Sequence, residues 1–229
     1  MNKTRERCFL LAATCLSAIG CVESQSTGQV APFQDRKVDA CLSIIVDMSG
    51  SFRESWDDRA YKLFLDLSDR FFTENMGGES KLVIGQISAN EQVLLFEGRP
   101  EDLRKRFNSP EEFNQFLLDR SDANGSYVFE ATRKAVEHLG AVSGVTEETR
   151  LLTVVLSDMQ DSQGDKRSLD RMAASLRQYQ ELGGALALYF VSESEIPRWR
   201  AIVNDAGFAP DHVMIENELA ASPRLPQFD

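Results

Sequence analysis

The feature that most constrains the fold is a short apolar run followed by an aspartate and two serines. Residues 44–46 are β-branched and show no alternating polar face, which is typical of a buried strand. Asp47 therefore lies where this strand ends, and Ser49 and Ser51 follow it in the next loop. The carboxyl ends of strands form the edge at which open α/β sheets bind ligands. Because carboxylate and hydroxyl oxygens suit Mg²⁺, Mn²⁺ or Ca²⁺, the loop is a candidate metal site.

An ordinary helix start is the alternative interpretation of this loop. Ser51 and Glu54 have the spacing of a capping box, in which each side chain bonds the backbone amide of the other residue. Asp47 would then be an ordinary loop carboxylate. The motif is short, so the choice between the two interpretations depends on what other oxygen ligands the chain brings to the same edge.

Strand patterns alternate with amphipathic helix patterns along most of the chain. This alternation predicts a mostly parallel sheet with helices on both faces, which is a doubly wound α/β fold. The turn at residues 90–91 is too short for a crossover, so the strands on either side of it should be antiparallel. Further strands are expected at 81–88, 93–96, 151–156, 185–191 and 212–215, and helices at 56–71, 100–107, 110–118, 128–139, 168–182 and 195–206.

The first twenty residues have the pattern of an export signal. Lys3, Arg5 and Arg7 precede thirteen uncharged residues at 8–20, a stretch too short to span a bilayer as a helix. Residues 16–21 (Leu-Ser-Ala-Ile-Gly-Cys) resemble the lipobox of bacterial lipoproteins, in which the cysteine is lipidated. That resemblance implies a lipid on Cys21 and anchoring at the bacterial cell envelope, on the outer membrane or the periplasmic face.

Two other interpretations of the N-terminus remain open. Ala18 stands where the lipobox usually has leucine, so ordinary secretory cleavage nearby is one alternative. A cytoplasmic protein with an apolar N-terminal helix is the other. On the lipoprotein interpretation, the chain divides into a signal peptide at 1–20, a flexible tether at 21–38, the folded domain at 39–216 and a loose C-terminal tail at 217–229.

The charge and the cysteines narrow the class of protein further. A formal net charge of −11 argues against a nucleic-acid binder, which needs a basic face for the phosphates. Cys8 and Cys15 would leave with the signal peptide and Cys21 would carry the lipid. Cys41 would then remain as an inert core residue with no partner for an intramolecular disulfide.

Two later segments add oxygen ligands to the edge that carries Asp47. Gly125 and Ser126 lie at the start of a predicted helix, and Asp158 follows an apolar strand as Asp47 does. Their alternative roles are a helix N-cap for Ser126 and a solvated loop acid for Asp158. Three loops at one edge would thus each supply an oxygen, which favours the metal interpretation.

This ordered set of residues closely resembles the metal-ion-dependent adhesion site of the von Willebrand factor type A domain. The resemblance covers roughly residues 39–216 and matches Asp47, Ser49, Ser51, Ser126 and Asp158. Ser126 replaces the usual threonine, and Met159 follows Asp158 where the family usually has glycine. The resemblance implies that the hydroxyls touch a divalent cation directly and that the aspartates often act through water. We expect Mg²⁺, with Mn²⁺ or Ca²⁺ as alternatives.

The resemblance also implies a function. One coordination position of the cation would accept an aspartate or glutamate from a protein partner, which describes a non-enzymatic adhesion or scaffold module. The alternatives are a Mg²⁺-assisted phosphoester hydrolase that uses the same carboxylates, and a structural domain whose metal site is vestigial. Asp161 and Asp165 are interpreted as solvated loop acids rather than a second cation site, and His138 and His212 form no zinc pattern.

Overall fold

The computed structural model describes residues 37–52, 55, 59–75, 78–218 and 225–226. The predicted signal peptide, Cys21, nearly all of the tether, Glu54 and Trp56 lie outside the described residues. Among the residues described, no helix combines the length and the apolar character that a membrane span requires.

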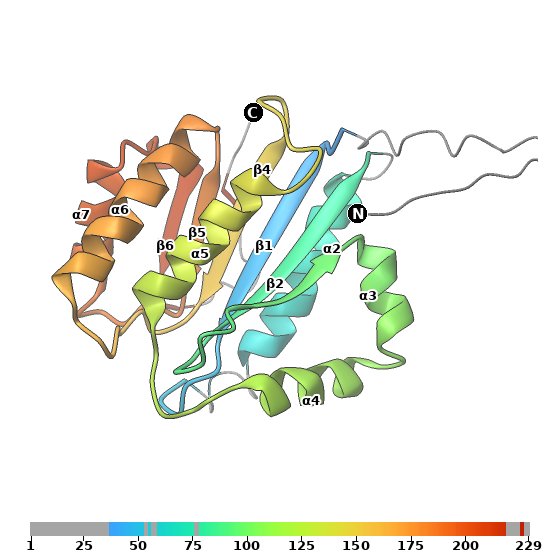
Figure 1. The fold of residues 1–229 in the computed structure, drawn as a ribbon, viewed down its shortest axis with the longest axis horizontal. Helices are drawn as coiled ribbons and strands as arrows, with labels where there is room; N and C mark the ends of the chain where they lie inside the picture. The colour runs from blue at the N-terminus through green and yellow to red at the C-terminus, as the bar shows by residue number, and fades with distance from the viewer. Residues whose placement is uncertain (1–36, 53–54, 56–58, 76–77, 219–224, 227–229) are drawn as a thin grey trace, which may run out of the picture. The chain divides into compact units, whose positions relative to one another are not determined.

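A six-stranded sheet forms the middle of the domain, in the order β3-β2-β1-β4-β5-β6. Its neighbours are parallel except for β2 and β3, which pair antiparallel at one edge (Figure 1). This arrangement confirms the predicted doubly wound α/β fold. The strands are β1 (Ala40–Asp47), β2 (Ser80–Ile87), β3 (Leu94–Gly98), β4 (Arg150–Leu156), β5 (Ala185–Tyr189) and β6 (Val213–Glu216).

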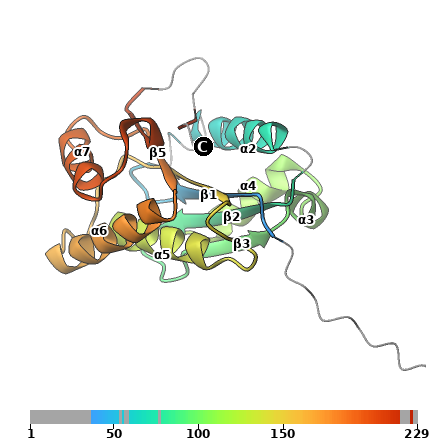
Figure 2. The same cartoon turned by 90° about the horizontal axis from the view of Figure 1, so that it is seen from above.

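Helices cover both faces of the sheet, as Figure 2 shows for α2 on one side and α5 and α6 on the other. The helices are α2 (Tyr61–Glu74), α3 (Pro100–Arg106), α4 (Pro110–Arg120), α5 (Val128–Ala141), α6 (Lys166–Glu181) and α7 (Ile196–Asp205), with a short 3₁₀ turn at Pro210–His212. Parallel strands need long crossovers, and these helices supply them.

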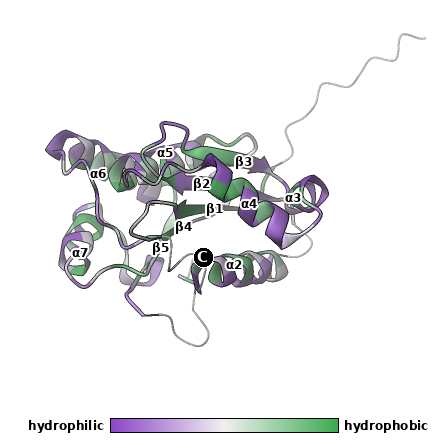
Figure 3. Cartoon of the chain, turned by 90° about the horizontal axis from the view of Figure 1, so that it is seen from below, coloured by the Kyte–Doolittle hydropathy of each residue, from purple (hydrophilic) through white to green (hydrophobic). Residues whose placement is uncertain are grey.

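The central strands are buried on both faces because their side chains alternate between two apolar clusters. Ile45 and Val155 pack with residues of α5, α6 and α7, whereas Ile44 and Val154 pack with residues of α2 and α4. This explains why residues 44–46 lack a polar face. Figure 3 shows that the surrounding helices carry both hydrophobic and hydrophilic stretches.

Most of the expected elements form within a few residues of their predicted ends, and two starts differ for clear reasons. The helix α6 begins at Lys166 rather than 168, because Asp165 accepts hydrogen bonds from the amides of Arg167 and Ser168 at 3.0 and 3.3 Å. Asp165 is therefore a helix cap. The regular part of α2 begins at Tyr61, later than the predicted 56, after a π-helical turn at 59–60. In the tail, Leu225 is buried against the α2 side of the core.

Replacing Leu67 by alanine should destabilise the domain by about 2–5 kcal/mol, because this side chain is 1% exposed and fills the space between α2 and the sheet. Leu65 on the same helix is 37% exposed, so Leu65→Ala should cost less than about 1 kcal/mol. Denaturant unfolding of both variants measures the difference. Equal effects would contradict the packing described for α2.

Candidate metal centre

The carboxyl ends of the adjacent strands β1 and β4 bring two of the predicted loops together. The first loop follows β1 and carries Ser49 and Ser51, and the third loop follows β4 and carries Asp158. The parallel pairing of β1 and β4 places Val46 opposite Leu156, so Asp47 and Ser157 follow at the same level of the sheet. The hydroxyl of Ser157 donates a hydrogen bond to Oδ2 of Asp47 at 2.6 Å. Side chains that are 110 residues apart in sequence thus meet at the sheet edge.

Asp47 is the buried centre of this group, with no exposed surface. Its Oδ1 accepts the backbone amide of Ser49 at 2.9 Å, and its Oδ2 also accepts the hydroxyl of Ser126 at 3.1 Å. One carboxylate therefore joins residues from three loops. An ionised carboxylate accepts hydrogen bonds only, so each of these groups donates to it.

Burial raises the pKa of the Asp47 carboxyl above its usual value, because the charged form loses its hydration. Hydrogen bonds from Ser157 and Ser49 act in the opposite direction, and the nearby charge of Asp158 raises the pKa further. Burial is the larger effect. A bound cation would reverse this balance because it favours the ionised form.

The hydroxyls of the first loop complete the cluster. The Oγ atoms of Ser49 and Ser51 are 3.2 Å apart. Ser49, Ser51 and Ser126 line a cavity of about 330 Å³ whose other walls are Gly50, Ala123, Asn124, Gly125, Gln160, Asp161 and Ser162. Two ligands at right angles around Mg²⁺, with bonds of about 2.1 Å, lie roughly 3.0 Å apart. The 3.2 Å spacing of the two hydroxyls is close to that value and is also an ordinary hydrogen-bond distance.

Four of the five predicted ligands belong to one hydrogen-bonded group, and the fifth lies beside it. Asp158 does not line the cavity, and its Oδ1 accepts the amide of Gln160 at 2.9 Å. It acts on Asp47 through its charge. Among the described residues, no three His, Cys, Asp or Glu side chains form a metal-binding group. Hydroxyl oxygens would thus have to supply most of the coordination.

Sequence reasoning did not identify Ser157 as part of the site. Its buried hydroxyl bonds Asp47 and also accepts the amide of Met159 at 2.9 Å. The only signal in the sequence is a serine at the end of an apolar strand. Its partner could be recognised only from the pairing of β1 with β4.

Buried apolar side chains next to the first and third loops pack on opposite faces of the sheet. Phe52 follows the first loop and packs edge-to-face on Phe190, with the ring centroids 5.4 Å apart. Met159 follows Asp158 and is buried in the cluster beneath α5 and α6. Met159 also has φ of 65°, a left-handed conformation that glycine adopts at lower cost. In this chain Met159, whose side chain is buried, occupies that conformation.

The acids and histidines outside the predicted set have local partners. Oδ1 of Asp161 accepts the amide of Phe129 at 3.2 Å, so this partly exposed loop acid also bonds the first turn of α5. His138 contacts Glu97 at 2.8 Å. Burial raises the pKa of the Cys41 thiol to about 12, in agreement with an inert core cysteine.

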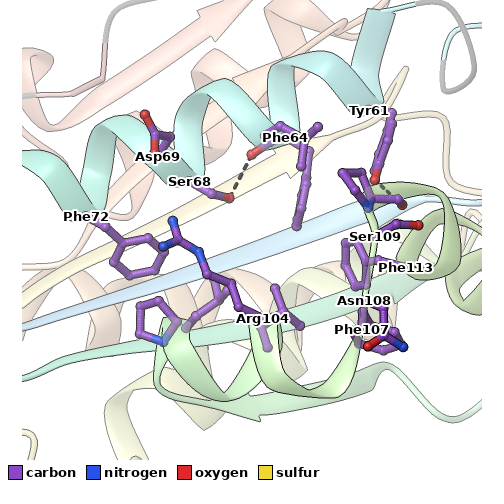
Figure 4. Close-up of a pocket in the computed structure, with 15 residues that line it drawn as sticks. Tyr61, Phe64, Ser68, Asp69, Phe72, Arg104, Phe107, Asn108, Ser109 and Phe113 are labelled. Atoms are coloured by element: carbon purple, nitrogen blue, oxygen red, sulfur yellow. Dashed lines mark hydrogen bonds between the residues drawn. The ribbon is translucent and has the colours of Figure 1, made fainter.

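A second cavity differs in chemistry from the cavity lined by Ser49, Ser51 and Ser126. It has about 420 Å³ and lies between α2 and the pair α3–α4, with aromatic walls that include Phe64, Phe107 and Phe113 (Figure 4). The hydroxyls of Ser68 and Tyr61 donate to the carbonyls of Phe64 and Pro110. This cavity offers apolar surface, whereas the cleft beside Asp47 offers oxygen ligands.

Comparison with known proteins was informative only at the level of structure. No family model matches the chain, and no curated protein matches it either. The pilus adhesin SpaC of Lactobacillus rhamnosus GG, in its open conformation, superposes with a TM-score of 0.54 at 12% identity, over 80% of this chain and 28% of that one. Manganese-loaded TRAP of Plasmodium vivax gives 0.52 at 14% identity, over 80% and 70%.

A third solved structure shows the same fold. The D319A mutant of the PilB minor pilin of Streptococcus sanguinis has a TM-score of 0.51 at 9% identity, over 81% of this chain and 58% of that one. The chain thus spans between 28% and 70% of the length of these proteins. These likenesses and the sheet order establish a von Willebrand factor type A-like fold.

In the presence of chelator, replacing Asp47 by asparagine should change how stability depends on pH. The folded protein holds the Asp47 proton above pH 3.8, where the unfolded chain has already lost it. Relative to Asp47→Asn, the free energy of unfolding of the wild type should therefore fall as pH rises from about 3.8 through the raised pKa. Denaturant unfolding at several pH values measures this difference, and a difference that is constant with pH would contradict it.

Proposed function

We propose that this protein is a divalent-cation-dependent protein-binding module held at the bacterial cell envelope. Asp47, Ser49, Ser51, Ser126 and Asp158 would hold the cation, and the cation would bind an aspartate or glutamate of a partner. The observation that carries the proposal is the fully buried carboxylate of Asp47, which gathers a backbone amide and two hydroxyls from three loops. Such a carboxylate is costly unless a positive charge is near it.

The chemistry of the cluster supports a carboxylate as the partner's ligand. Hydroxyl oxygens coordinate a cation without neutralising it, so an incoming carboxylate is attracted to the remaining charge. The cavity beside the hydroxyls is open and is lined by small and neutral side chains apart from Asp161. An acidic side chain on an exposed loop of a partner would fit this space without meeting a bulky residue.

The solved structures of similar fold agree with such a role. One of them is named a pilus adhesin and another a minor pilin, and the TRAP protein was crystallised with manganese. For this chain, binding of Mg²⁺, Mn²⁺ or Ca²⁺ and a place at the cell surface are inferences from its own residues and from that fold. The phosphoester hydrolase is the weaker candidate, because the described cavity lining consists of hydroxyls, amides, small residues and one carboxylate that bonds backbone amides.

Adding Mg²⁺, Mn²⁺ or Ca²⁺ to the chelator-treated protein should raise its melting temperature by a few degrees. A ligand at about 100 times its Kd adds roughly 2.7 kcal/mol to the free energy of unfolding. Ser126→Ala and Asp158→Asn should reduce or abolish the rise. Asp170→Asn, a change at an exposed residue of α6, should leave it intact. A wild type that responds to none of the three cations would refute the proposed site and favour a vestigial one.

The anchor has a separate test in a bacterial host. If Cys21 carries the lipid, the wild type should fractionate with membranes and incorporate a labelled fatty acid, because acyl chains partition into the bilayer. Cys21→Ser should release the protein and abolish labelling, while Cys41→Ser serves as the matched cysteine control. Labelling that persists in Cys21→Ser would exclude this residue as the anchor.

A further inference from the structure

A reciprocal pair of hydrogen bonds joins two loops that line the proposed cation site. The second loop lies before α5 and carries Ser126, and the third loop follows β4 and carries Ser162. The amide of Ser126 donates to Oγ of Ser162 at 2.8 Å, and the amide of Ser162 donates to the carbonyl of Ser126 at 2.8 Å. The two residues are 36 positions apart in sequence. This pairing fixes both sides of the Ser126 backbone to the loop that follows β4.

Asp161 adds a third bond between the same two loops. Its Oδ1 accepts the amide of Phe129 in the first turn of α5, while its Oδ2 accepts the amides of Gln163 and Gly164, each at 3.0 Å. Tyr127 at the N-cap of α5 makes no capping bond with its own side chain, so Asp161 satisfies the first turn from a distant loop. Both of its oxygens are thus used by backbone amides, which makes Asp161 a support rather than a ligand.

The orientation of the Ser126 hydroxyl follows from these contacts. With its amide and carbonyl held by Ser162, the side chain of Ser126 points to Asp47 and donates to Oδ2 at 3.1 Å. Serine has a single heavy substituent on Cβ, so its χ1 is less restricted than that of a β-branched residue. The loop pairing fixes the backbone from which this hydroxyl reaches Asp47.

We propose that Ser162 and Asp161 are positioning residues of the cation site, which hold Ser126 in its coordinating orientation without touching the cation. The inference rests on the function proposed above. It extends that function by assigning part of the cation affinity to residues outside the ligand set, because groups that orient metal ligands commonly change affinity by about 10–100-fold. Preorganisation lowers the entropy that the loops lose when the cation binds.

The test compares cation Kd and chelator-state stability in three purified serine variants. Ser162→Ala removes the acceptor of the Ser126 amide and should weaken the Mg²⁺ Kd by about tenfold. Its melting temperature in chelator should fall by less than the affinity loss corresponds to, because Ser162 is exposed and only the amide of the buried Ser126 loses its acceptor. Ser162→Thr keeps the oxygen and should restore the Kd. Ser194→Ala, at an exposed serine whose hydroxyl contacts that of Ser192, is the control that should change nothing.

Two further measurements address the loop pairing itself. Asp161→Asn has only one acceptor oxygen for three amides and should weaken the Kd in the same direction as Ser162→Ala. Hydrogen exchange in chelator should show a faster-exchanging Ser126 amide in Ser162→Ala than in the wild type. This readout needs no cation, so it reports on the pairing even if the proposed function fails.

The outcomes separate the two ideas. A wild type without any cation response overturns the proposed function and this inference with it. A wild type that binds Mg²⁺ while Ser162→Ala binds it equally well overturns only the positioning role. Two further outcomes would show a purely structural role and would also overturn the positioning role. One is a loss of Mg²⁺ affinity that comes with an equal loss of stability in chelator, and the other is a loss of affinity that Ser162→Thr does not restore.

Discussion

Burying the carboxylate of Asp47 at the end of the central strand imposes a cost that its surroundings must offset. Two hydroxyls and one amide converge on it, and they come from the loops after β1 and β4 and from the segment before α5. These hydrogen bonds link three loops at the sheet edge. The buried carboxylate has lost its hydration and accepts several hydrogen bonds. A bound cation would further stabilise its negative charge.

The loops that carry these donors are held rigidly by the two apolar layers. Phe52, after the first loop, packs in the apolar cluster between the sheet and α2. Met159, in the third loop, packs in the cluster between the sheet and the helices α5 and α6. Met159 adopts a left-handed backbone conformation, which destabilises the folded state by about 1–3 kcal/mol. Such a conformation persists only where surrounding contacts stabilise it. Its buried side chain and the bond from its amide to Ser157 provide them. Packing on both faces of the sheet holds the short polar loops, so their oxygen atoms keep fixed positions relative to one another.

Much of this could be anticipated from local patterns. The alternation of strands and helices predicted the doubly wound sheet, and the short turn at 90–91 predicted the antiparallel edge pair. The rule that strand ends share an edge anticipates Asp47, Ser49 and Ser51 at that edge, whereas Ser126 follows no strand, and its place beside Asp47 was expected from the resemblance. The shift of α6 by two residues was not anticipated, because the capping role of Asp165 looks in sequence like an ordinary acidic loop.

The sequence by itself determined the order of the elements and the chemistry available at each strand end, because both depend on periodicity and residue type within a few positions. Only the tertiary structure decided that Ser157 bonds Asp47 across 110 residues and that Ser162 pairs with Ser126 across 36. These contacts depend on the register of β1 against β4 and on how two loops fold over the sheet edge. Local patterns do not encode such long-range geometry, because register depends on which strands pair and on which of their faces become buried.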